Sequence, residues 1–234
     1  MSGAADDWAY EHLGVFGWTT EFWDVINVAT GSKSSTDIWY VGPTAEQERA
    51  VYNWVVANHP HLYADWQPFQ HPQLGAVEIG GWDELNVWSN APASMLLAEV
   101  KPHAEFAVYQ ALCSPRLEVL KAHAVSLGGD TYRVEVGVAN TGWLPTYVSK
   151  HARASHLVLP TVAQLSGAEV VDGVARREVG HLEGRLANRF SYGKNDGTPD
   201  RALVTWVVRG TKGQRVQVDV SGERAGSSSV EIVL

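Results

Sequence analysis

Cysteine is nearly absent from this chain, since Cys113 is the single cysteine among 234 residues. A lone thiol excludes an internal disulfide and a zinc knuckle, because each needs more than one cysteine in the chain. Cys113 ends an apolar stretch with helical spacing, which predicts an inert buried thiol; the alternative is a nucleophile.

Runs of basic residues are also missing. The chain has 18 Lys and Arg against 26 Asp and Glu, giving a formal net charge of -8. Nucleic acids and anionic membranes favour clustered cations, so we expect neither as a partner. A composition with 45% hydrophobic and 19% charged residues is that of an ordinary globular protein.

Long hydrophobic runs are the third absence. No segment approaches the roughly eighteen consecutive apolar residues of a membrane span. The start, MSGAADDWAYEHLG, has no basic region followed by an apolar run, so it shows no signal peptide. The apolar pattern begins at once with Trp8, Tyr10 and Leu13, which leads us to expect further residues upstream in the full protein.

The first half of the chain predicts a mixture of helices and strands. Asp6 or Asp7 would cap a short helix that Gly14 ends. Residues 15–25 alternate aromatic with small or polar side chains, which predicts a strand. Two longer helices follow: one begins after the capping box of Thr44 and Gln47, and one spans about 93–112.

The pattern changes at Ser114-Pro115, after which no convincing helix is seen. Short strand patterns separated by glycine and asparagine turns follow, and they predict a β-sandwich of immunoglobulin or fibronectin type. We therefore predict an α/β domain over 1–112 and an all-β domain over 116–234. The predicted strands are 117–126, 132–139, 156–159, 168–171, 176–182, 203–208, 215–220 and 230–234.

Glu21 is the most unusual side chain of the first half, because it is the single glutamate in the aromatic segment GVFGWTTEFWDV. The predicted strand places it on one face with Thr19 and Trp23, in a half-dry setting. Such a setting raises a carboxyl pKa toward neutrality, as a general base requires. The alternative is a structural glutamate paired with a Lys or Arg.

The stretch DWAYEHLGVFGWTTEFWD resembles the zinc carboxypeptidases of the carboxypeptidase A type. The family pattern is Asp-Trp-x-Tyr, a glycine-containing turn, and a strand with Thr-x-Glu and then Asp. Residues 7–10 match its first part, and Thr19, Glu21 and Asp24 match its second. HPQLGAVEIGGW at 71–82 and the Asn-Thr-Gly at 140–142 are similar to later segments of bacterial members.

The resemblance implies that the first domain is the end of a mixed catalytic sheet and that Glu21 is the general base and acid beside a catalytic zinc. It also implies a peptide or protein substrate that is hydrolysed at its C-terminal bond, and it favours a secreted or periplasmic location over a cytoplasmic one. The family holds zinc through His-x-x-Glu and a later His, all upstream of the glutamate. No His-x-x-Glu occurs here, so we expect no metal bound to this chain and no hydrolysis without the upstream remainder of the domain.

Three further expectations concern other surfaces. His59, His61 and His71 form the densest histidine cluster, which we interpret as helix-end and turn residues instead of a metal site. Trp82 and Trp88 offer the alternative of a non-catalytic module for peptide or cell-wall glycan, against the interpretation that they pack a core with Trp54 and Trp66. A sheet cut part-way would expose its edge, which predicts either self-association or a partial rearrangement of residues 1–112.

Overall fold

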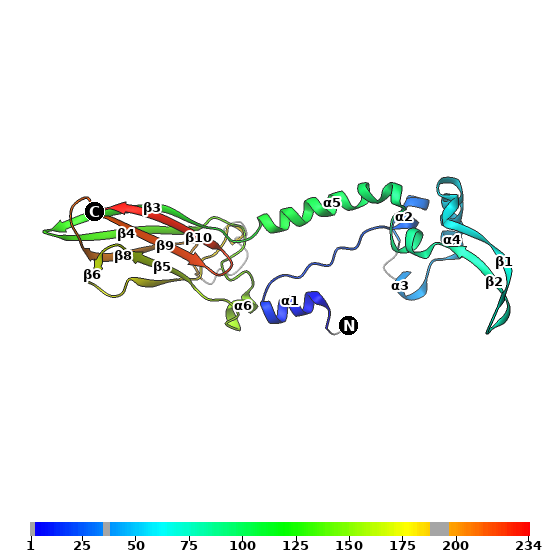
Figure 1. The fold of residues 1–234 in the computed structure, drawn as a ribbon, viewed down its shortest axis with the longest axis horizontal. Helices are drawn as coiled ribbons and strands as arrows, with labels where there is room; N and C mark the ends of the chain where they lie inside the picture. The colour runs from blue at the N-terminus through cyan, green and yellow to red at the C-terminus, as the bar shows by residue number, and fades with distance from the viewer. Residues whose placement is uncertain (1–2, 35–37, 188–196) are drawn as a thin grey trace. The chain divides into compact units, whose positions relative to one another are not determined.

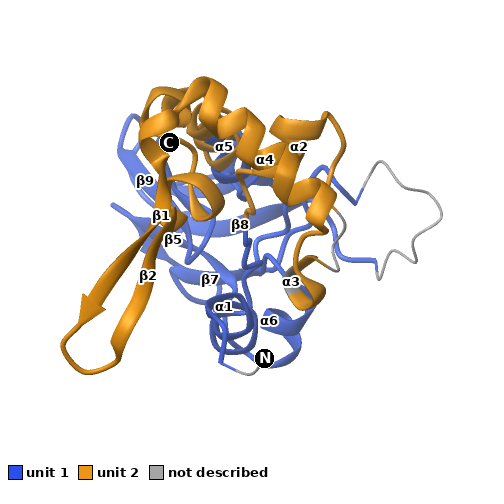
Figure 2. Cartoon of the chain, turned by 90° about the vertical axis from the view of Figure 1, so that its right-hand side faces the viewer, with its two compact units in different colours: residues 1–19, 108–234 blue, residues 20–107 orange. Residues whose placement is uncertain are grey.

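The computed structural model describes residues 3–34, 38–187 and 197–234 (Figure 1). The chain divides into two compact units, which Figure 2 colours separately. We call residues 1–19 and 108–234 the sheet unit, and residues 20–107 the hairpin unit. These units do not coincide with the predicted domains 1–112 and 116–234, which stay a prediction.

Within its described residues, the sheet unit contains two antiparallel sheets of four strands each. One sheet has the order β3-β4-β8-β6, and the other has the order β10-β9-β5-β7. Their bounds are β3 Leu117–Gly128, β4 Thr131–Asn140, β5 Thr161–Ser166, β6 Glu169–Val170, β7 Arg176–Gly180, β8 Arg201–Arg209, β9 Arg215–Gly222 and β10 Gly226–Val233. The prediction that this half is largely β is confirmed.

Two predictions for this unit were wrong. Residues 156–159 form no strand, because His156 adopts a φ of 54° and the chain turns there. The strand comes later, as β5, where the buried side chains of Thr161, Ala163 and Leu165 alternate with less buried ones. A short helix, α6 (Lys150–Ala154), was not expected; the Ser149 side chain caps it by accepting a hydrogen bond from the Ala152 N–H.

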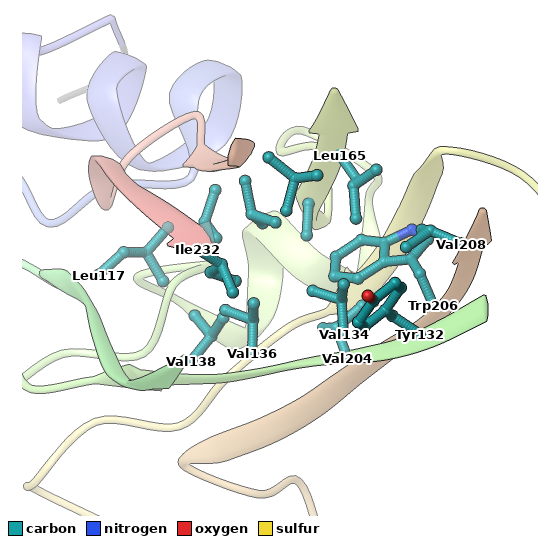
Figure 3. Packing of buried hydrophobic residues seen from close by; sticks show 14 of the residues in the cluster. Leu117, Tyr132, Val134, Val136, Val138, Leu165, Val204, Trp206, Val208 and Ile232 are labelled. Atoms are coloured by element: carbon teal, nitrogen blue, oxygen red, sulfur yellow. The ribbon is translucent and has the colours of Figure 1, made fainter. Parts of the chain in front are cut away.

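The larger hydrophobic core of the sheet unit draws on both sheets, as Figure 3 shows. On β4 the side chains of Val134, Val136 and Val138 are fully buried, because alternate residues of a strand point to the same face. Trp206 from β8 and Val218 from β9 are also fully buried in this cluster. Each such side chain contributes roughly 1.5–3 kcal/mol by leaving water, so this core is the main source of stability in the unit.

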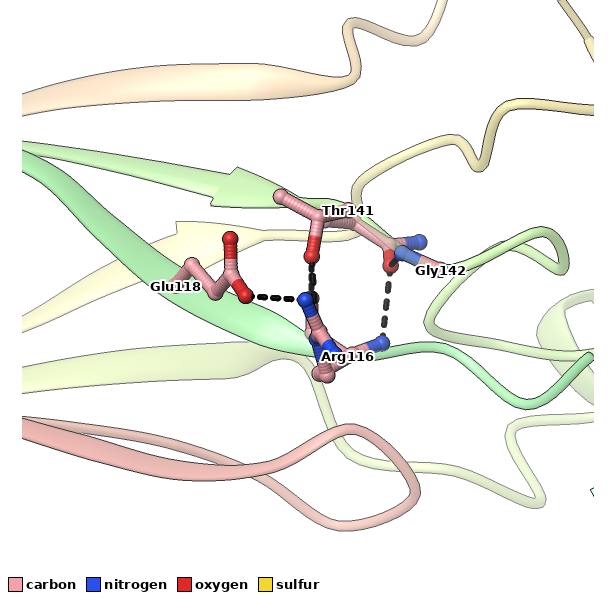
Figure 4. A network of polar contacts seen from close by, with 5 residues as sticks. Arg116, Glu118, Thr141 and Gly142 are labelled. Atoms are coloured by element: carbon pink, nitrogen blue, oxygen red, sulfur yellow. Dashed lines mark hydrogen bonds and ion pairs between the residues drawn. The ribbon is translucent and has the colours of Figure 1, made fainter. Parts of the chain in front are cut away.

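Asn140, at the end of β4, is bonded to the segment just before β3; Figure 4 labels two of its partners, Arg116 and Gly142. Its Oδ1 accepts from the backbone N–H groups of Arg116 and Gly142, at 3.0 Å each. Its Nδ2 donates to the Leu144 carbonyl at 2.8 Å. A Cβ on Gly142 would lie 2.3 Å from the Ser114 carbonyl oxygen, so only glycine fits there. The Asn-Thr-Gly sequence is therefore a structural junction.

Helix α1 (Ala5–Leu13) belongs to the sheet unit and ends at Gly14, as predicted. Gly14 has the left-handed φ of 61° that is common at helix C-termini. Tyr10 stacks on His151 of α6, with ring centroids 5.0 Å apart. These contacts attach α1 to the region of α6.

In its described residues, the hairpin unit is built from helices and one antiparallel pair of strands. Val51 and Val55 of α4 are fully buried beside Val25 and Val87. The capping box of Thr44 and Gln47 is present, which confirms that helix. The elements are α2 Val25–Thr30, α3 Ile38–Val41, α4 Ala45–Asn58, the 3-10 helix η1 Pro60–Leu62, β1 Tyr63–His71, β2 Gly75–Trp82, the π-helix η2 Leu85–Ser89 and α5 Ala93–Leu112, of which residues 108–112 belong to the sheet unit.

Helix α5 confirms the predicted span of 93–112 and runs through Pro102 without a break in the helix assignment. Cys113 follows it and is half-buried, which is more open than the buried thiol we predicted. Every strand pair in the described residues is antiparallel. None of the helices in the described part of the chain is long and apolar enough to cross a membrane.

Candidate functional site

Glu21 does not lie on a strand, and this part of the prediction was wrong. Residues 15–24 have no regular secondary structure, and no described strand pairs with them. The alternating pattern has the β preference of a strand, but an isolated extended segment has no partner for its backbone hydrogen bonds. Trp23 also turns the chain, because its φ is 69°.

Trp23 is the anchor of this segment. A positive φ is rare for a large side chain and costs of order 1–3 kcal/mol, so the surrounding contacts must hold it. The Trp23 backbone N–H donates to Oε1 of Glu99 at 2.8 Å, and its indole N–H donates to the Val87 carbonyl at 2.7 Å. Its ring lies 6.2 Å from that of Trp54, measured between centroids. The hydrogen bonds to Glu99 and Val87 together hold the chain in its turn at Trp23.

Asp24 starts the next helix. Its Oδ1 accepts from the Asn27 N–H at 3.0 Å, and its Oδ2 accepts from the Ser34 N–H at 3.1 Å and the Ser34 hydroxyl at 2.8 Å. Partial burial raises the pKa of Asp24, but these hydrogen bonds to the charged form outweigh it, so the pKa lies below the ordinary value. The motif aspartate is thus a charged N-cap for α2.

A cavity of about 760 Å³ opens beside this segment, within the hairpin unit. Residues 21–28 form one wall. The lining also includes Glu84 and Trp88 from the region of η2, and Glu99 and His103 from α5. Glu99 and His103 are four residues apart, so they share one face of the helix. The His103 ring lies 5.5 Å from that of Phe22.

Glu21 is exposed at this cavity, so the half-dry setting expected for it was also wrong. Its carboxylate has no hydrogen-bond or ion-pair partner among the described residues. The alternative of a structural glutamate paired with a Lys or Arg is therefore not supported by the described residues. An exposed, unpartnered carboxylate at a cavity can accept a proton or attract a cation. Its catalytic role stays a prediction.

The first part of the motif falls in the other unit, whereas Asp24 shares the hairpin unit with Glu21. Asp7, Trp8 and Tyr10 belong to α1 and hence to the sheet unit, whereas Glu21 belongs to the hairpin unit. The Trp8 side chain is 56% exposed.

The histidine cluster has structural roles. His59 ends α4, and the rings of His59 and His61 are 6.3 Å apart. Nδ1 of His71 accepts from the Gln73 and Leu74 N–H groups at 3.1 Å each, within the turn of the β1–β2 hairpin. The helix-end and turn interpretation is confirmed for His59 and His71. In residues 3–34, 38–187 and 197–234 no group of three or more His, Cys, Asp or Glu side chains is placed to hold a metal ion.

The tryptophans divide between core and surface. Trp54, Trp82 and Trp88 are half-buried and pack against the core of the hairpin unit, as the core interpretation predicts. Trp82 and Trp88 meet edge to face, with centroids 6.0 Å apart, so they form no open platform. Trp66 was wrongly assigned to the core, because it is 60% exposed on β1.

Among the polar residues of the cavity, Glu84, Glu99 and His103 were not predicted from the sequence. For the last two a signal existed: a carboxylate and an imidazole four residues apart in a predicted helix lie on one face. Nothing in the sequence linked that face to residues 21–24. Glu84 precedes a π-helix, and no pattern predicted that element.

No curated protein matches the sequence. A family model for a domain of unknown function, DUF8731, matches residues 116–233. The matched segment is just over half of the chain and includes the eight strands that the structure describes in the sheet unit. The chain therefore belongs to the family that this domain of unknown function defines.

Proposed function

We propose that the chain is the C-terminal part of a bacterial zinc metallocarboxypeptidase and that Glu21 is its general base. The sequence motif from Asp7 to Asp24 suggests the family. The observation that carries the proposal is the position of Glu21: its carboxylate is exposed at a cavity of about 760 Å³ and has no partner among the described residues. A general base must be free to reach the proton that it removes.

In the proposed reaction a water oxygen bonds to the carbonyl carbon of the C-terminal peptide bond. Glu21 accepts the proton that this water loses and donates it to the amine nitrogen as the carbon–nitrogen bond breaks. The products are a free amino acid and a peptide shortened by one residue. No other side chain of the cavity needs to change its charge in this sequence.

Zinc would polarise the carbonyl and activate the water in such an enzyme. The described residues do not fit a zinc site, since they contain no suitable group of three ligands. The proposal therefore requires that the ligands come from an upstream remainder of the catalytic domain. A secreted or periplasmic location is part of the same proposal.

For the sheet unit we propose an immunoglobulin-like sandwich as an accessory domain. Lettering its strands in chain order, with β7 set aside, makes β3, β4, β8 and β6 strands A, B, E and D. The other sheet then reads G, F and C, with β7 beside C. A-B-E-D facing G-F-C is the strand order of the immunoglobulin constant fold.

The test uses the full-length protein with its zinc. Glu21→Gln should lower peptide hydrolysis by about a hundredfold or more, because loss of a general base typically costs 10²–10⁴-fold. Zinc content, measured by mass spectrometry of the metal, should not change. Glu78→Gln is the matched control. Glu78 is exposed on β2 outside the cavity, and its replacement by glutamine removes the same charge as Glu21→Gln does. Full activity in Glu21→Gln would refute the assignment.

A second candidate is a binding module for peptide or cell-wall glycan. One observation favours it: Trp66 is 60% exposed on the β1–β2 hairpin, where Phe69 and Ile79 are 44% and 42% exposed. Exposed aromatic rings can stack on sugar rings. Titration of peptidoglycan fragments against Trp66→Ala and the unchanged chain would show weaker binding by the variant; equal binding would exclude this surface.

A further inference from the structure

The Glu21 side chain is held in place only through its backbone, as far as the described residues go. Its carboxylate is exposed at the cavity and has no hydrogen-bond or ion-pair partner among them. A general base must come within about 3 Å of the atom that loses the proton. The reach of Glu21 into the cavity therefore depends on what fixes the backbone of residues 21–23.

Helix α5 contacts the two residues that directly follow Glu21. Oε1 of Glu99 accepts a hydrogen bond from the Trp23 backbone N–H at 2.8 Å. One turn further along the helix, the His103 ring lies 5.5 Å from the Phe22 ring, measured between centroids. Both contacts come from one face of α5, because residues four apart lie above each other on a helix. One rigid element thus holds the backbone that carries Glu21.

The bond from Glu99 is the contact that restrains the backbone itself. Trp23 has a φ of 69°, which a residue with a large side chain leaves unless its surroundings hold it there. The indole bond to the Val87 carbonyl holds the ring of Trp23 but does not engage its backbone. A carboxylate forms a stronger hydrogen bond to an N–H than a neutral acceptor does. Loss of Glu99 would therefore let the φ of Trp23 relax and would shift Glu21 relative to the cavity.

We propose that Glu99 is a positioning residue for Glu21. By accepting the Trp23 N–H it keeps the chain turned and so places the Glu21 carboxylate at the cavity. Glu99 neither gains nor loses a proton in this role. A displacement of about 1 Å in a reacting group can cost about a hundredfold in rate, so a residue that never touches the substrate can still control the reaction. The catalytic consequence rests on the proposed function of Glu21.

The first test measures the backbone of this chain and needs no turnover. Nitrogen-15 relaxation gives the order parameter of the Glu21 amide in the unchanged chain and in three variants. Glu99→Leu should lower it by roughly 0.2, toward the range of a flexible backbone, and Glu99→Gln should keep it because an acceptor oxygen remains. Glu105→Leu is the matched control and should have no effect. Glu105 is an exposed acid of the same helix and lies outside the cavity lining.

The second test measures peptide hydrolysis by the full-length protein with its zinc. The value of kcat is expressed per bound zinc, so that a smaller folded fraction does not count as lost activity. Glu99→Leu should lower kcat about tenfold to a hundredfold and leave KM within about twofold, because the base is misplaced while substrate binding is not. Glu99→Gln should restore most of kcat. In a Glu21→Gln background, Glu99→Leu should cause no further loss, since the base that it positions is already gone.

Three results would overturn the proposal. An unchanged order parameter at Glu21 in Glu99→Leu would show that other contacts hold the backbone. Equal losses of kcat in Glu99→Gln and Glu99→Leu would assign the effect to the charge and not to the hydrogen bond. A full further loss in the Glu21→Gln background would show that Glu99 does not act through Glu21. All three would leave the role of Glu21 standing, because that role fails only if Glu21→Gln alone keeps full activity.

Discussion

The Ser149 hydroxyl donates a hydrogen bond to the carbonyl oxygen of Gly14, which lies 135 residues earlier in the chain. The same hydroxyl accepts from the Ala152 N–H at 3.1 Å and so caps α6. The Arg224 guanidinium reaches the Gly14 carbonyl as well, at 3.4 Å, and also the Leu13 carbonyl. The carbonyl groups of Leu13 and Gly14, at the C-terminal end of α1, therefore find donors in Ser149 and Arg224.

Gly14→Ala should weaken this attachment. The φ of 61° disfavours any residue with a Cβ, and a Cβ there would lie 2.4 Å from that of Ala152. The strain and the clash together should lower the free energy of unfolding of the sheet unit by about 2–5 kcal/mol. Denaturant unfolding followed by circular dichroism measures the change.

Gly226→Ala separates the two causes. Gly226 lies in the same unit, has a φ of 74°, and a Cβ there would meet nothing within 4 Å. The Gly226→Ala variant should therefore lose only the part of the unfolding free energy that comes from backbone strain, about 1–2 kcal/mol. Equal losses in the two variants would mean that α1 moves away from Ala152 at no cost, and the attachment described here would then be weak.

The strands of the sheet unit were largely predictable because each strand carries an alternating pattern of apolar and polar residues that can be recognised in its own sequence. Along β4, buried valines alternate with more exposed residues, and turns with glycine or asparagine separate it from its neighbours. The same alternation predicted a strand at residues 15–25 and failed. Pairing with a second strand depends on the whole fold. The sequence around Glu21 therefore does not show that this segment has no partner strand among the described residues.

The candidate site was predictable only in part, for a similar reason. Glu21 was notable on its own, as a carboxylate in an aromatic segment. Glu99 and His103 come from a helix about 80 residues away, and they meet the segment because Trp23 turns the chain at a positive φ. Such a φ in a tryptophan has no sequence signal, since it is imposed by the contacts of its indole and its backbone N–H.

Replacing Glu99 should release that turn. In Glu99→Leu the Trp23 N–H loses its acceptor, and the hairpin unit should lose about 1–3 kcal/mol of stability. The sharper measurement is hydrogen exchange at the Trp23 amide, which should become much faster. Glu99→Gln keeps a carbonyl oxygen in place and should preserve most of the protection.

The pair of variants distinguishes an acceptor from a charge. Protection of the Trp23 amide in Glu99→Gln but not in Glu99→Leu would support the hydrogen bond as the restraint on Trp23. Unchanged exchange in both variants would contradict it and would assign the restraint to the indole bond to Val87 alone.

The stability of the sheet unit should depend on the protonation of His181. Burial lowers the pKa of His181 below its ordinary value of 6.5, and the charge of Arg153 lowers it further, against a smaller opposing effect of Glu178. The folded state then binds fewer protons than the unfolded state. The contribution of neutral His181 is therefore fully present above pH 6.5 and is lost as the pH falls through the folded-state pKa.

Unfolding free energies measured by denaturant titration from about pH 5 to 8 should thus rise with pH and level off near 6.5. His181→Gln should flatten the rise, because glutamine has no proton to gain. His12→Gln is the matched control, since His12 is an exposed histidine of the same unit. A slope that His181→Gln leaves unchanged would show that another group, and not the buried imidazole, opposes protonation in the folded state.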